Sequence, residues 1–103
     1  MKKRILLSVL AAVALTTAAD DKEATNSYMA GRTAYETGDY REAAEKFEDA
    51  ELLGDSTAVK ANSVLAQISA WRMCGLLYRE FEAIEKLLAS YPEYADFAAL
   101  IQR

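Results

Sequence analysis

The chain has 103 residues, 52% of them hydrophobic, and a net charge of −4 at pH 7. This length holds one domain at most, and the apolar content is too high for a disordered segment. The negative charge argues against binding to nucleic acid or to an anionic membrane surface, because both depend on lysine and arginine. Glycine (4 residues) and proline (1 residue) are scarce, and no apolar–polar alternation indicates strands, so we expect helices throughout.

Residues 1–19 have the three parts of a secretory signal peptide: a positive start, an apolar run over residues 5–15, and small residues before Asp20. The run is shorter than the roughly 20 residues that span a bilayer. We expect cleavage before Asp20 and an exported protein, soluble in the periplasm or another extracytoplasmic space; an uncleaved membrane anchor is the alternative. The only cysteine is Cys74, so no lipid-attachment cysteine follows the run. Loss of three positive charges, Lys2, Lys3 and Arg4, would change the net charge from −4 to −7.

A first helix is expected over residues 23–37, ended by Gly38. Asp39 and Glu42 then have the spacing of a capping box, which starts a second helix over residues 40–53. Small residues and tyrosines at spacings of three and four form the buried face of the first helix: Ala24, Ser27, Tyr28, Gly31, Ala34 and Tyr35. The second helix buries Tyr40, Ala43, Phe47 and Ala50, and its charged outer face, which includes Glu48 and Glu51, is expected to be solvated.

Two further helices follow the Gly54-Asp55 pair, over residues 56–74 and 78–90, with a weaker turn at Gly75. The third helix is expected to bury one stripe, and Glu82 and Lys86 of the fourth have the spacing of an ion pair. Residues 94–103 are apolar and helix-forming. The expected buried stripe of the third helix is Ala61, Val64, Leu65, Ile68, Trp71 and Gly75. That of the fourth helix is Phe81, Ile84, Leu87, Leu88 and Tyr91.

Gly38 and Gly75 stand 37 residues apart, each between two helices, and such a period is typical of helical solenoids. The residues Ala30-Gly31, Tyr35, Gly38-Asp39-Tyr40, Ala43, Phe47 and Ala50 resemble the tetratricopeptide repeat over about one full repeat. The second copy is degenerate, because Glu80 stands where a small residue is expected and Leu77 replaces Tyr40. Residues 85–94 (EKLLASYPEY) resemble the close of repeats in exported bacterial scaffolds, namely outer-membrane assembly lipoproteins (BamD-like) and the Tol-Pal coordinator.

The resemblance implies an all-α fold of antiparallel helix pairs, stacked as a right-handed tetratricopeptide-type α-solenoid over residues 20–103. It implies about two repeats and the start of a third. The first helix of each pair would line a concave surface that binds a partner, with packing between helices as the alternative role for the tyrosines. The partner-binding residues so expected are Tyr28, Arg32, Tyr35, Glu36, Ser69 and Arg72.

Little in the sequence indicates catalysis. The chain has no histidine and no glycine-rich phosphate loop, and Cys74 has no histidine to activate it. We expect a buried structural thiol, no catalytic or metal-binding residues, no cofactor and no enzyme activity.

The expected function is that of an exported protein–protein interaction scaffold or adaptor. Its partner would be a protein or peptide, which the resemblance places in cell-envelope assembly, with membrane association only through partners. The alternatives are a structural oligomerisation or spacer module and the docking arm of a longer exported enzyme. The apolar final helix has no stop signal, so we expect truncation there or self-association through it.

Overall fold

The computed structural model describes residues 21–96, which contain four α-helices and no strand. The all-α prediction is confirmed. The signal peptide, and residues 97–103 of the expected final helix, lie outside the described residues; Pro92–Tyr94 forms a 3-10 helix, η2. The α-helices are α2 (Lys22–Glu36), α3 (Tyr40–Leu53), α4 (Thr57–Cys74) and α5 (Leu77–Ser90).

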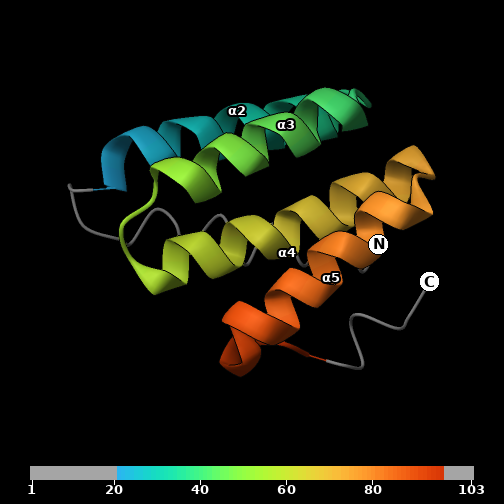
Figure 1. The fold of residues 1–103 in the computed structure, drawn as a ribbon. Coiled ribbons are helices and arrows are strands. Elements are labelled where there is room, and N and C mark those ends of the chain that lie inside the picture. Colours follow the sequence, from blue (N-terminus) through green and yellow to red (C-terminus); the bar gives the residue numbers. More distant parts are fainter. Residues whose placement is uncertain (1–20, 97–103) are drawn as a thin grey trace.

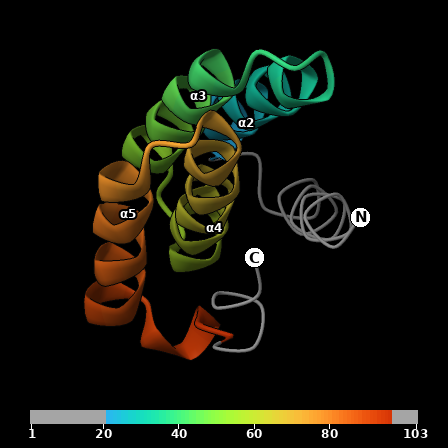
Figure 2. The same ribbon diagram turned by 90° about the vertical axis from the view of Figure 1, so that its right-hand side faces the viewer.

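The helices run antiparallel in chain order and each packs on the next (Figure 1). The main contacts join α2 to α3, α3 to α4 and α4 to α5, with a smaller contact between α2 and α4. Figure 2 shows α3 and α5 along one side of the molecule and α2 and α4 along the other, with α4 packed against both α3 and α5. The described chain is therefore a stack in which α2 and α5 are the outer helices.

Local signals set the ends of the helices, as expected. Gly38 and Gly75 adopt left-handed backbone angles, φ 90° and 78°, which glycine reaches without strain. The carboxylate of Asp39 accepts a hydrogen bond from the Glu42 amide at 3.4 Å. The hydroxyl of Ser56 accepts one from the Val59 amide at 3.2 Å. Each cap satisfies an amide that the first turn of a helix leaves free.

The α2–α3 pair packs closely because Gly31 has no side chain. A Cβ at Gly31 would lie 2.7 Å from Cε1 of Phe47 and 3.2 Å from the carbonyl oxygen of Ala43. Phe47 is fully buried and its ring centroid lies 5.1 Å from that of Tyr28. The predicted pairing of small residues with aromatic rings is thus confirmed here.

The central helix α4 is buried more completely than a single stripe predicts. All residues from 61 to 71 are buried, including the polar Asn62, Ser63, Gln67 and Ser69. The Ser63 hydroxyl donates to the Val59 carbonyl at 2.8 Å, which satisfies its polar atom inside the same helix. Burial on several sides follows from the central position of α4 in the stack.

The burial predicted for α5 is partly wrong. Phe81 is 53% exposed and Leu88 is 37% exposed, whereas the buried side of this helix carries Glu80, Ala83 and Leu87. The reason is the position of α5 at the outer end of the stack, where α4 covers only one side of it. The predicted burial of Leu87 is confirmed.

The two helix pairs correspond at a separation of 37 residues. The second helices α3 and α5 begin at Tyr40 and Leu77, and each has 14 residues. The left-handed glycines that precede them are separated by the same number. Equivalent positions in the two pairs can therefore be compared directly.

Candidate functional site: a groove between α3 and α5

The six residues expected on a concave surface are divided among four separate structural contacts. Arg32 pairs with Glu36 at 3.4 Å on the surface of α2, and the side chains are 28% and 59% exposed. The hydroxyl groups of Tyr35 and Ser69 lie 3.0 Å apart and join α2 to α4. Tyr28 packs in the core and is 1% exposed. Only Arg32 and Glu36 of these residues present much surface.

Arg72 is held inside the structure. Its Nε atom lies 2.6 Å from Oε2 of Glu80, and the two side chains are 7% and 0% exposed. This contact explains why Glu80 replaces the small residue found at the equivalent position Ala43 of the first pair. The carboxylate occupies that buried position because the guanidinium of Arg72 neutralises it.

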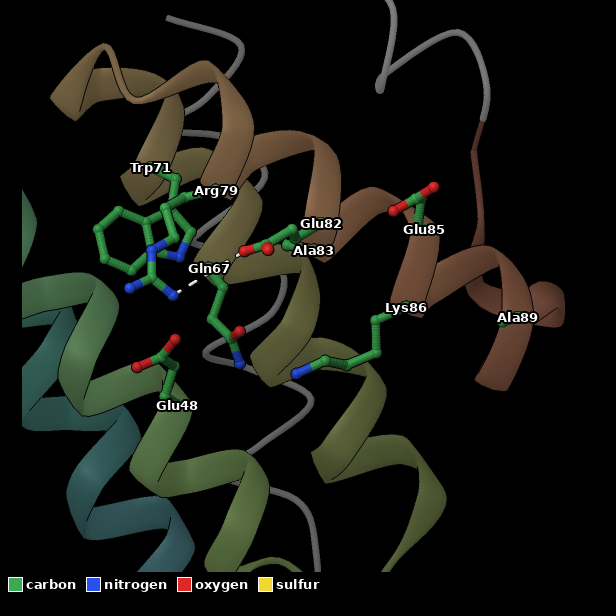
Figure 3. Close-up of a pocket in the computed structure, with 9 residues that line it drawn as sticks. All are labelled: Glu48, Gln67, Trp71, Arg79, Glu82, Ala83, Glu85, Lys86 and Ala89. Carbon is green, nitrogen blue, oxygen red and sulfur yellow. Dashed lines mark ion pairs between the residues drawn. The ribbon is translucent and has the colours of Figure 1, made fainter.

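A hollow lined by described residues lies elsewhere, over the second helices of the two pairs. It has a volume of about 510 Å³ between α3 and α5, with α4 as its floor (Figure 3). We name it the α3–α5 groove. Its lining residues are Glu48 from α3, Gln67 and Trp71 from α4, and Arg79, Glu82, Ala83, Glu85, Lys86 and Ala89 from α5.

Polar contacts across the helices fix one wall of the groove. The ammonium group of Lys86 lies 3.0 Å from Oε1 of Glu51, and Gln67 Nε2 donates to the same oxygen at 2.9 Å. Three helices therefore meet at one carboxylate. The predicted Glu82–Lys86 pair is wrong, because Lys86 reaches across to α3 instead of along its own helix.

Arg79 lines the groove from α5, two turns before Lys86. Its guanidinium carbon lies 5.4 Å from the centroid of the Trp71 ring and 5.6 Å from that of Tyr78. Oε1 of Glu82 lies 3.9 Å from Nη1 of Arg79 (Figure 3). Cation–π contacts of this kind hold a guanidinium over an aromatic face while its outer edge stays available to solvent.

Glu48 points into the groove from α3 (Figure 3). Burial raises the pKa of its carboxyl group, and the charges of Arg79 and Lys86 counter part of that rise. Within the described residues, Glu48 has no ion pair within 4 Å. The groove thus combines an unpaired carboxylate, two cations and an aromatic ring in a partly enclosed space.

Sequence reasoning missed this groove. It placed Glu48 on a solvated face, paired Glu82 with Lys86, and treated Trp71 as one member of a buried stripe. No sequence pattern reports the distance between α3 and α5, which are not consecutive helices. The only signal available was the mixture of both charge signs along α5, in Arg79, Glu82, Glu85 and Lys86, together with the single tryptophan of the sequence.

The described residues offer little else for chemistry. In residues 21–96, no group of three or more His, Cys, Asp or Glu side chains could hold a metal ion. Cys74 is a half-buried free thiol at the end of α4, and burial raises its pKa. None of the helices between residues 21 and 96 is long and apolar enough to cross a membrane.

Comparison with known proteins adds no assignment. Protein-family models, curated proteins and solved structures were searched, and none matches this chain. The fold therefore defines the protein only as an all-α chain of antiparallel helix pairs with a groove between its second helices.

Proposed function

We propose that this chain is an exported, non-enzymatic scaffold that binds a segment of a partner protein in the α3–α5 groove. The observation that carries the proposal is the groove itself, in which Trp71, Arg79 and Glu48 from three helices face one space. Tryptophan and arginine are the residue types most enriched at binding hot spots. Carboxylates and cations in the same groove favour a partner segment with polar side chains of both signs.

The class of scaffold that we propose is a tetratricopeptide-type solenoid. Antiparallel pairs, the 37-residue correspondence and the close Gly31–Phe47 packing support this proposal. The signal-like residues 1–19 and the resemblance to outer-membrane assembly and Tol-Pal scaffolds favour a partner in the cell envelope.

Three single charge reversals test the groove in a pull-down from the envelope fraction of the organism that encodes the chain. Arg79→Glu changes the groove, Arg32→Glu changes the α2 surface expected from the sequence, and Arg41→Glu changes an exposed arginine of α3 outside both. We expect Arg79→Glu to reduce partner recovery at least about tenfold, since an interface charge reversal costs more than 1.4 kcal/mol. Arg41→Glu should recover the partner like the parent chain.

Two results would contradict the proposal. One is unchanged recovery with folded Arg79→Glu. The other is loss with Arg32→Glu alone, which would place binding on the α2 surface. Arg72→Glu does not serve in this test, because it would put two carboxylates together inside the structure.

A further inference from the structure

The outer helix α5 has an exposed apolar face, and the equivalent face of α3 is covered by other helices. At a separation of 37 residues, Leu77, Phe81, Ile84 and Leu88 of α5 correspond to Tyr40, Ala44, Phe47 and Glu51 of α3. We call these four α5 residues the α5 end face. Leu77, Phe81 and Leu88 are 50%, 53% and 37% exposed, whereas Ala44 and Phe47 are 0% exposed.

Two helices cover this face of α3: α2 contacts Tyr40 and Phe47 through the rings of Tyr35 and Tyr28, and α4 covers the side that carries Glu51. Gln67 of α4 donates to the Phe47 carbonyl at 3.4 Å and to Glu51 at 2.9 Å. Lys60 of α4 donates to the Glu51 carbonyl at 3.0 Å. The α3–α4 contact therefore shows which kind of element fits this face of a second helix: the first helix of another pair, packed alongside it.

The other outer helix, α2, is such a first helix, and two of its three residues at the matching positions are exposed. Subtracting 37 from Lys60, Gln67 and Trp71 gives Glu23, Ala30 and Ala34. Glu23 and Ala30 are exposed, whereas Ala34 is 6% exposed and belongs to the hydrophobic core. We call these three residues the α2 end face. The α2 end face thus carries two alanine side chains and one glutamate, whereas the α5 end face carries four large apolar side chains.

The two end faces both carry an apolar residue at a position where the α3–α4 contact has a polar one. Inside the chain, a polar residue on α3 (Glu51) meets a polar residue on α4 (Gln67). At the equivalent positions, α5 has Leu88 and α2 has Ala30, so both members are apolar. Phe81 replaces Ala44, and the small α2 residues leave room for its ring. The edge of the contact also differs. Lys60 donates a hydrogen bond to the Glu51 carbonyl near the end of α3, and the carboxylate of Glu23, at the equivalent position of α2, cannot donate one.

We propose that the α5 end face of one chain packs on the α2 end face of a second copy, repeating the α3–α4 contact between molecules. This inference goes beyond the binding groove and does not depend on it, since none of the residues of the two end faces lines the groove. The contact is heterologous, so each chain keeps one free α2 face and one free α5 face. Association is therefore open-ended instead of stopping at a symmetric dimer.

Sedimentation velocity of the full chain over a range of concentrations measures this association. Phe81→Glu blocks the α5 end face and Ala30→Glu blocks the α2 end face; both positions are exposed, so the monomer should stay folded. Each variant alone is expected to associate at least about tenfold more weakly than the parent chain, because the contact would bury an unpaired carboxylate. Circular dichroism checks that both variants keep the parent helix content.

Mixing the two variants gives the decisive result. An Ala30→Glu chain retains a working α5 face and a Phe81→Glu chain retains a working α2 face, so the mixture should form a 1:1 heterodimer that grows no further. Leu52→Glu is the matched control, since Leu52 is 79% exposed and lies outside both faces; it should associate like the parent chain.

Three results would overturn the inference. The parent chain could remain monomeric at every concentration. Phe81→Glu could associate as the parent chain does, which would place association on another surface. The mixture could fail to form the heterodimer although both variants are folded. Binding of an envelope partner through the groove is measured separately, so either proposal can fail without the other.

Discussion

Arg72 and Glu80 form a buried ion pair between α4 and α5, with 2.6 Å between Nε and Oε2. The equivalent positions of the first helix pair are Tyr35 and Ala43, which carry no charge. The second pair therefore uses an internal charge contact where the first uses aromatic and small residues. A buried pair of this kind is costly to break by removing one partner, because the other charge remains desolvated.

Arg72→Ala is expected to destabilise the fold by about 3–5 kcal/mol, since it leaves the Glu80 carboxylate buried without its guanidinium. Urea denaturation followed by circular dichroism measures the change. The double variant Arg72→Tyr/Glu80→Ala places the residues of the first helix pair, Tyr35 and Ala43, at the equivalent positions of the second helix pair. It should lose much less stability than Arg72→Ala. If the double variant is as unstable as the sum of the single variants, the pair does not act as a unit.

Gly31→Ala is expected to destabilise the chain although alanine is the better helix former. The new Cβ would lie 2.7 Å from the Phe47 ring, which is fully buried and cannot move aside freely. We expect a loss of about 1–3 kcal/mol, as for other overpacked cores. Phe47→Leu removes the ring, so the combined variant should lose less than the two single losses added together. A gain in stability for Gly31→Ala alone would contradict the packing described for α2 and α3.

Tyr28→Phe is expected to leave stability unchanged or to raise it. The Tyr28 hydroxyl is buried and has no hydrogen-bond partner among residues 21–96, so its removal relieves a desolvation cost of about 1–3 kcal/mol. Thermal unfolding at neutral pH checks this result. A large loss of stability would mean that the hydroxyl is bonded.

The same residue predicts a dependence of stability on alkaline pH. Burial raises the pKa of the Tyr28 hydroxyl above its usual value of about 10. The unfolded chain ionises this group above about pH 10 while the folded chain does not, so stability is complete below that pH and falls above it. Tyr28→Phe should flatten this fall but not abolish it, because burial also raises the pKa of Tyr91.

Cys74 should react slowly with iodoacetamide in the folded chain. Burial raises the pKa of its thiol, so less of the reactive thiolate is present at neutral pH than in the unfolded chain. We expect the alkylation rate, measured by mass spectrometry, to rise when urea unfolds the protein and to rise at a higher pH in the folded state. Equal rates in the two states would show that the thiol is not shielded.

The parts of the fold that depend on local signals were predictable from the sequence. Gly38 and Asp39 act through a backbone angle and a cap within one turn, so the start of α3 follows from residues a few positions apart. The start of α4 was predicted from the Gly54-Asp55 pair, whereas its cap is the next residue, Ser56. The Gly31–Phe47 packing was also predictable, because small and aromatic residues recur at helical spacing.

The features that depend on how three helices sit together were not predictable. Lys86 meets Glu51 of α3 across 35 positions of sequence, and this contact requires the angle between two helices that are not consecutive. The exposure of Phe81 likewise depends on which elements stand beside α5. A periodic pattern marks a residue as apolar on one side of a helix, but it does not report whether that side is covered.

Site-specific photo-crosslinking tests the groove proposal most directly. A photoreactive amino acid replaces Glu85 in the groove, Glu36 on α2 or Glu45 on the exposed side of α3, and the full chain is irradiated with its envelope partner. The account predicts a covalent adduct from position 85, its loss when Arg79→Glu is added, and little adduct from positions 36 and 45. An adduct from position 36 alone, or equal adducts from positions 85 and 45, would contradict it.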